Sequence, residues 1–127
     1  MTPFACPCGA TPSLVYAECC GRYHAGALHL LAPTAEALMR SRYSAYVLDL
    51  TGYLSETWHP SSRPADIETN PPRLKWLGLE VRLHTLQDAD HASVEFVARS
   101  KLGGRAQRLH ETSRFVREDG LWYYVDG

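Results

Sequence analysis

The sequence predicts an α+β fold in which helices pack on one face of an antiparallel sheet. Apolar residues recur at helical spacing between positions 34 and 58, whereas from position 77 onward they alternate with polar residues. All four cysteines fall between positions 6 and 20. That stretch is too short to form a hydrophobic core of its own without a cross-link such as a bound metal ion. We therefore expect two units, a knuckle over residues 1–26 and an α+β domain over residues 27–127.

The bulk composition is that of an ordinary globular chain. Of its 127 residues, 45% are apolar and 21% are charged, which fits one domain with a short appendage. The formal net charge of -1 argues against a nucleic-acid partner, because such binders usually show a clear basic excess. We find neither a signal peptide nor an apolar run of about 20 residues, and therefore expect no membrane contact and a cytoplasmic protein with reduced thiols.

Two helices are expected first. Thr34 is a good N-cap and Glu36 suits the positive first turn, so the first helix begins here. Gly52 is expected to separate it from a short helix over 53–58, which Pro60 ends. The apolar positions of the first helix are Leu38, Met39, Tyr43, Tyr46, Val47 and Leu50.

Four strands are expected after a loop. Residues 60–73 hold four prolines and many turn formers, as loops do. The connections between the later apolar segments are short and rich in Gly and Asp, which favours antiparallel hairpins. The predicted strands cover 77–84, 91–101, 106–117 and 121–125.

The cysteines form two close pairs, in the segments CPCG at 6–9 and CCG at 19–21. Two such pairs can supply the four thiolates of a tetrahedral zinc site, in which no coordination position stays open for water. A disulfide between adjacent cysteines is strained, since bridged Cα atoms prefer to lie about 5.5 Å apart. We therefore predict one structural Zn²⁺ on Cys6, Cys8, Cys19 and Cys20. Disulfides, free thiols, or His24 in place of Cys20 are the alternatives.

The two cysteine segments resemble the SEC-C motif, a zinc knuckle also found at the tail of the SecA translocation ATPase. The loop between the pairs, GATPSLVYAE, is two residues longer than in the usual motif and has no Lys or Arg. Metal binding tolerates the longer loop. A docking role that depends on a basic loop does not transfer to this chain.

Other segments resemble the bacterial YchJ-type family, which joins a SEC-C motif to a nuclear-transport-factor-2-like (NTF2-like) domain. The resemblance implies a cystatin-like cone, in which a curved antiparallel sheet wraps around helices and often leaves an apolar cavity. It also implies that two copies can form a homodimer through the sheet. The matching segments are RSRYSAY at 40–46, TWHP at 57–60, WLGL at 76–79, QDAD at 87–90, FVAR at 96–99, SRF at 113–115 and WYYVDG at 122–127.

Two residues are candidates for acid–base chemistry in such a cone. His59, which follows Trp58, can exchange a proton near neutral pH, although a histidine at a helix end also suits a simple cap. Glu111 shares a strand face with Ser113 and Phe115. If that face points inward, Glu111 would be a buried base.

Six further residues are pocket candidates. Arg40 borders the apolar stripe of the first helix, so it could reach a cavity or only cover the rim of the stripe. Tyr43 lies within the stripe. Either Arg99 or Arg114 could instead pair with Glu111, which would make that carboxylate structural. The complete set of pocket candidates is Arg40, Tyr43, Trp58, Arg99, Arg114 and Tyr124.

Two functions are open on these grounds. A small-molecule- or protein-binding module with a structural zinc is favoured, because the zinc site is closed and no Walker loop, Rossmann fingerprint, nucleophile elbow or HExxH motif occurs. A protein partner would bind the knuckle, and a small ligand the cone. The alternative is a cofactor-free isomerase, dehydratase or hydrolase, which requires His59 and Glu111 to meet in one cavity.

Overall fold

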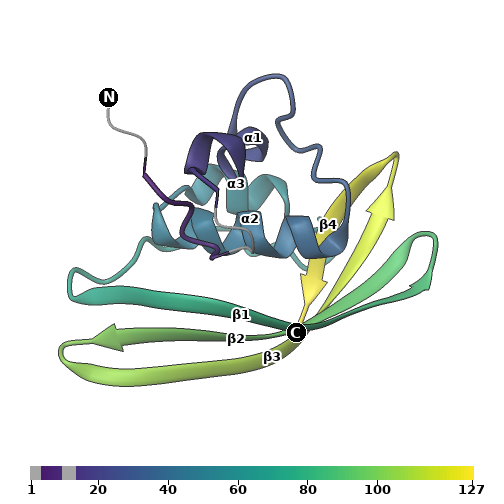
Figure 1. Cartoon of the computed structure of the whole chain (residues 1–127). Coiled ribbons are helices and arrows are strands. Elements are labelled where there is room, and N and C mark those ends of the chain that lie inside the picture. The colour runs from purple at the N-terminus through teal and green to yellow at the C-terminus, as the bar shows by residue number, and fades with distance from the viewer. Residues whose placement is uncertain (1–3, 10–13) are drawn as a thin grey trace.

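The computed structural model describes residues 4–9 and 14–127. Its four strands form one antiparallel sheet in the order β1-β2-β3-β4. Figure 1 shows that this sheet is strongly bent and that the helices lie on its concave side, which confirms the predicted α+β cone. The elements are η1 (Tyr16–Glu18), α1 (Gly21–His24), α2 (Ala35–Val47), α3 (Thr51–Glu56), β1 (Leu74–Asp88), β2 (His91–Leu102), β3 (Arg105–Glu118) and β4 (Leu121–Asp126).

Helix α2 begins where its capping signal predicts. The side chain of Thr34 accepts a hydrogen bond of 3.0 Å from the backbone N–H of Ala37. The break before α3 falls at Asp49, which adopts a left-handed φ of 58°, and not at Gly52, which lies inside α3. The predicted position of the break is therefore wrong. Among the described helices, none is both long enough and apolar enough to cross a membrane.

Strand β1 departs from the simple alternation that the sequence suggested. Its register against β2 shifts between Trp76 and Gly78 and again between Val81 and Leu83. Each irregularity turns the following side chains to the other face of the sheet. As a result Leu77 and Leu83 are 57% and 58% exposed. The simple alternation would place them on one face with Leu79 and Val81, which are half-buried, and in this respect it is wrong.

One core joins the knuckle to the cone. Strand β2 contributes Val94, Phe96 and Ala98 from its inward face, as its alternation predicted. Helix α2 contributes Leu38, which is 1% exposed. All four cysteines belong to the same buried cluster as these side chains. The knuckle therefore packs against the larger domain and does not stand apart from it.

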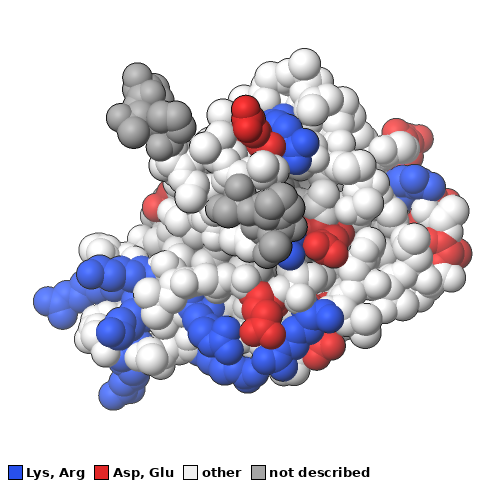
Figure 2. Space-filling model, viewed as in Figure 1, with Lys and Arg blue, Asp and Glu red and all other residues white. Residues whose placement is uncertain are grey.

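Basic side chains gather at one end of the sheet. Figure 2 shows Lys and Arg along the lower left of the molecule, where the β2–β3 hairpin ends. In the sheet register Lys75 lies opposite Lys101, and Arg99 lies opposite Arg108. Like charges in directly opposed positions repel each other. The net charge of -1 thus conceals a local basic excess that the composition could not reveal.

Candidate functional site

Two chain segments bring the four cysteines together. Cys6 and Cys8 lie on the segment 4–9, whereas Cys19 and Cys20 lie where η1 ends and α1 begins. All four side chains are buried, and their sulfur atoms lie within 4.8 Å of one another. The sulfurs of Cys8 and Cys19 are 3.6 Å apart, and none of the four forms a disulfide. Residues 10–13 of the connecting loop lie outside the described residues.

A glycine after each cysteine pair is required, for a different reason in each case. Gly9 has a φ of 65°, and its N–H donates a 3.3 Å hydrogen bond to the carbonyl of Cys6, which closes a tight turn. Gly21 has no positive φ, but a Cβ at this position would lie 2.7 Å from the carbonyl oxygen of Tyr16. The backbone around both pairs can therefore come close enough to cluster the sulfurs.

The cluster has the size and chemistry of a metal site. Tetrahedral Zn²⁺ with Zn–S bonds of about 2.3 Å places its sulfurs about 3.8 Å apart. The distance of 3.6 Å between Cys8 and Cys19 is close to that value, and the four sulfurs all lie within 4.8 Å of one another. Burial and the neighbouring thiols of Cys6 and Cys8 raise the pKa of Cys19 to about 12. Hydrogen bonds with the same two thiols raise the pKa of Cys20. Four thiols so close cannot all ionise unless a cation compensates them, and a divalent metal ion supplies that charge.

His24 lies beside the cluster but directs both ring nitrogens elsewhere. Its Nε2 is 2.7 Å from the carbonyl oxygen of Ser41, which can only accept, so Nε2 carries the proton. Its Nδ1 then accepts a short hydrogen bond from the hydroxyl of Tyr16. Burial lowers the pKa of His24 and keeps the ring neutral. These contacts favour a purely cysteine ligand set.

Arg40 serves the knuckle and not the cone. Its Nη1 donates a 3.1 Å hydrogen bond to the carbonyl of Cys8, and its Nε is 3.1 Å from the carboxylate of Glu36. One turn further along α2, the hydroxyl of Ser44 lies 3.5 Å from the sulfur of Cys6. With these contacts Arg40 points away from the cavity between α2 and the sheet, and it is not among the residues that line that cavity.

A cavity of about 420 Å³ lies between α2 and the inner face of the sheet. Two predicted pocket residues, Tyr43 and Tyr124, line it, as does Glu111. Its walls are largely apolar and aromatic. The other aromatic and apolar lining residues include Tyr46, Trp76, Phe96, Ala98 and Leu109.

Arg42 also lines this cavity and is only 3% exposed. Its Nη1 donates hydrogen bonds to the carbonyl of Leu54 at 2.9 Å and to the hydroxyl of Thr57 at 2.6 Å. Its guanidinium carbon is 4.6 Å from the centre of the Tyr124 ring. Arg42 is not among the residues that the sequence predicts for the pocket, because a charged residue within an apolar stripe normally covers the rim of that stripe.

Glu111 lies on the inward face of β3. Its same-face neighbours Ser113 and Phe115 are 1% and 2% exposed. The hydroxyl of Ser113 donates a 2.6 Å hydrogen bond to the Glu111 carboxylate, and the backbone of Gly127 packs against the same group. The carboxylate thus lines the cavity with only one strong donor from the described chain.

Three other predicted pocket residues do not line this cavity. Trp58 packs edge-on behind its wall. Arg99 lies 3.6 Å from Glu80, and Arg114 forms an ion pair with Asp126, so neither pairs with Glu111. The two arginines alternate with inward residues on their strands and therefore point away from the cone.

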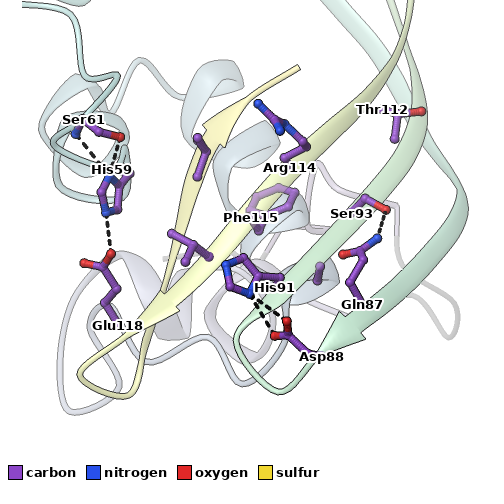
Figure 3. Close-up of a pocket in the computed structure, with 13 residues that line it drawn as sticks. His59, Ser61, Gln87, Asp88, His91, Ser93, Thr112, Arg114, Phe115 and Glu118 are labelled. Atoms are coloured by element: carbon purple, nitrogen blue, oxygen red, sulfur yellow. Dashed lines mark hydrogen bonds and ion pairs between the residues drawn. The ribbon is translucent and has the colours of Figure 1, made fainter.

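His59 lines a second, open groove of about 860 Å³ at the other end of the sheet. Figure 3 shows that its ring points toward Glu118, with Nε2 2.8 Å from the carboxylate, while Nδ1 is 2.7 Å from the hydroxyl of Ser61. Arg114 and His91 lie across the same groove. His59 and Glu111 therefore line different cavities. The predicted convergence of these two side chains on one cavity does not occur.

Comparisons with known proteins agree with the fold described above. The profile of the YchJ middle NTF2-like domain matches residues 34–127. A UPF0225 protein from Bordetella parapertussis is 60% identical over 126 residues, which are 99% of this chain and 93% of the relative. A UPF0225 protein from Methylibium petroleiphilum is 62% identical over 125 residues, 98% of this chain and 88% of the relative.

The chain belongs to the YchJ family. A crystal structure of a SEC-C motif containing protein from Psychrobacter arcticus aligns with this YchJ-family chain at a TM-score of 0.77. The two are 34% identical, and the alignment covers 95% of this chain and 80% of the other. At that coverage the match includes most of the cysteine knuckle as well as the cone, so the resemblance to a SEC-C motif joined to an NTF2-like domain is confirmed.

Proposed function

We propose that this YchJ-family protein binds a small molecule in its cone and is held together by one structural zinc ion. The 420 Å³ cavity carries the first part of this proposal. Its volume falls in the range of about 300–1,000 Å³ that small-molecule sites occupy. Apolar and aromatic walls with a few convergent polar groups, here Arg42, Glu111 and Tyr124, are the usual composition of such sites.

The cysteine cluster supports the zinc part of the proposal. Four thiolates fill the tetrahedral coordination sphere of Zn²⁺, so the ion would be structural and would not activate water. Cys6 contacts Ser44 on α2, and the cavity lies on the other side of this helix. Zinc would therefore stabilise one wall of the binding site. Thiolate ligands suit the reducing cytoplasm, where we expect the protein to work.

Metal content tests the zinc part. We expect one zinc per chain in purified protein, with the four thiols becoming reactive only after chelation. Protein that carries no metal and has reactive thiols from the start would contradict a structural zinc.

Ligand binding is tested with two matched variants. Ala98 lines the cone cavity and Ala92 lines the open groove beside His59, and both are buried. Ala98→Leu should fill part of the cone, whereas Ala92→Leu should fill part of the groove. In an NMR screen of small fragments, we expect wild type and Ala92→Leu to bind the same compounds and Ala98→Leu to lose them. Equal binding by Ala98→Leu would place any site outside the cone.

The structure does not meet the main requirement of the alternative function, the acid–base enzyme. An acid–base enzyme built on His59 and Glu111 needs both groups in one cavity, and they line two. A protein partner at the knuckle and a homodimer formed through the sheet stay predictions.

A further inference from the structure

Arg42 is a buried cation with no carboxylate partner among the described residues. Its side chain is 3% exposed, yet the ion pairs of the described chain all involve other cations. Taking a guanidinium out of water is costly unless an anion or several hydrogen bonds compensate it. The aromatic rings of Trp58 and Tyr124, at 5.1 and 4.6 Å, compensate it in part.

The structural role of Arg42 uses only part of its guanidinium. Nη1 makes both of the hydrogen bonds with good geometry, to Leu54 and Thr57 near the C-terminal end of α3. The Tyr46 hydroxyl also favours the charged form of Arg42 and raises the pKa that burial lowers. A guanidinium carries five N–H donors on three nitrogens, in a planar fork that matches a carboxylate. Both hydrogen bonds that Arg42 makes to described residues at 2.9 Å or less come from Nη1, so Nε and Nη2 can donate to a group inside the cavity that Arg42 lines.

The other residues that line the cavity indicate what kind of ligand could carry the group that pairs with Arg42. The ring systems of Tyr43, Trp76 and Phe96 form an apolar wall for the body of a ligand. Glu111 and Glu68 are the acidic lining residues, and neither lies within ion-pair distance of Arg42. A hydroxyl or amino group of the ligand would meet the Glu111 carboxylate, which accepts from Ser113 but has further lone pairs free.

The charge balance favours a carboxylate over a phosphate. One arginine compensates a single negative charge, whereas a phosphate monoester carries about 1.5 to 2 charges at neutral pH. The excess charge would face Glu111 and Glu68 in the same small cavity. We infer that the cone binds a small organic carboxylate, whose carboxylate group pairs with Arg42 and whose apolar body packs on the aromatic wall. This inference rests on the proposed function and names its ligand class.

Matched probe compounds test the inference in the unaltered protein. Phenylacetate, phenylacetamide and phenyl phosphate share one apolar body and differ in the group that would reach Arg42. We expect phenylacetate to bind at least about tenfold more tightly than phenylacetamide, as a charge-assisted bond to a buried arginine implies, and more tightly than phenyl phosphate. Two-dimensional NMR titration gives the affinity and shows whether the shifted signals belong to cavity residues.

A variant pair assigns the effect to Arg42. In Arg42→Gln the preference of phenylacetate over phenylacetamide should fall to within about twofold. Arg114→Gln is the matched control, because Arg114 is paired with Asp126 and lines the other groove, and the preference should persist there. If Arg42→Gln fails to fold, the comparison of acid and amide in wild type still decides the inference.

The outcomes separate this inference from the proposed function. Equal binding of acid and amide in the cone would overturn the carboxylate assignment and leave a small-molecule site. Tighter binding of phenyl phosphate would also overturn it and point to a phosphate ligand. Absence of cone binding for all three compounds, in protein that NMR shows to be folded, would overturn both.

Discussion

The backbone carbonyl of Cys8 accepts a hydrogen bond of 3.1 Å from Nη1 of Arg40, which lies 32 positions later in the chain. Together with the contact between Cys6 and Ser44, it seats the knuckle on α2. Arg42, on the same helix, lines the cavity on the other side. Helix α2 therefore contacts the knuckle on one side and lines the cavity on the other. A change in the packing of the knuckle should also affect the cavity.

Replacing Arg40 should loosen the knuckle without removing its metal. In Arg40→Met the Cys8 carbonyl loses its partner, at a cost of about 1 kcal/mol in the free energy of unfolding. Hydrogen exchange should then be faster over residues 14–24, while the zinc content stays at one per chain. Arg82→Met is a suitable control, since Arg82 forms only an exposed pair with Glu80. Unchanged exchange in Arg40→Met would show that this contact does not hold the knuckle.

Replacing Cys8 should have a wider effect. Cys8 is 0% exposed and belongs to the same core as α2, so Cys8→Ser removes a ligand and disturbs shared packing. We expect loss of the bound zinc and a loss of stability of roughly 3 kcal/mol or more, because metal binding energy is folding energy in such knuckles. Elemental analysis and chemical denaturation measure the two. Glu18→Gln, a change at an exposed position next to Cys19, should alter neither. Retention of one zinc by Cys8→Ser would contradict a four-thiolate site.

Parts of the fold were predictable because their signals are local. The Thr34 cap and the alternation of β2 depend on a few neighbouring residues, and both are observed. The irregular register of β1 depends on how it pairs with β2, a partner that no local pattern describes. For that reason the exposure of Leu77 and Leu83 could not be read from the alternation.

The residues of the candidate sites also differ in how far the sequence predicts them. The cysteine cluster was predictable because its four ligands come from two short segments. Arg42 was not, because a charged residue in an apolar stripe normally covers its rim. Its burial depends on Leu54 and Thr57, which meet it only after α2 and α3 have packed. The separation of His59 from Glu111 likewise depends on a distant contact, because the N–H of His59 donates to the carbonyl of Tyr124 on β4.

Two glycines should respond in opposite ways to alanine. A Cβ on Gly21 would lie 2.7 Å from the carbonyl oxygen of Tyr16, which is backbone and cannot move alone. A Cβ on Gly52 would meet nothing within 4 Å, and Gly52 lies inside α3. We expect Gly21→Ala to destabilise the protein and Gly52→Ala to stabilise it by about 0.5–1 kcal/mol. Thermal unfolding of the zinc-loaded variants provides the comparison, and an unchanged melting temperature in Gly21→Ala would contradict the close approach.

Stability should fall in mild acid partly because of His24. Burial lowers its pKa in the folded protein below the ordinary value of 6.5. Between the folded pKa and 6.5 the unfolded chain binds more protons, so stability is full above about pH 6.5 and is lost as the pH falls. In His24→Gln this part of the slope should disappear.

Denaturation between pH 8 and pH 5, with zinc present, measures the slope. Protonation of the thiolates acts in wild type and variant alike, so the difference between the two slopes isolates His24. His110→Gln, at an exposed pair with Glu95, is the control. Identical slopes for wild type and His24→Gln would mean that the burial of His24 has no effect on its proton affinity.

Reversing one charge at the basic end of the sheet should stabilise the protein. Lys75 and Lys101 are both exposed and face each other across β1 and β2, where like charges repel. Lys101→Glu replaces that repulsion with attraction and should add about 0.5 kcal/mol at low salt, with Lys101→Gln giving roughly half. Because both charges are in contact with water, 0.5 M salt should remove most of the difference. A variant no more stable than wild type at low salt would mean that Lys75 and Lys101 avoid each other by extending into solvent.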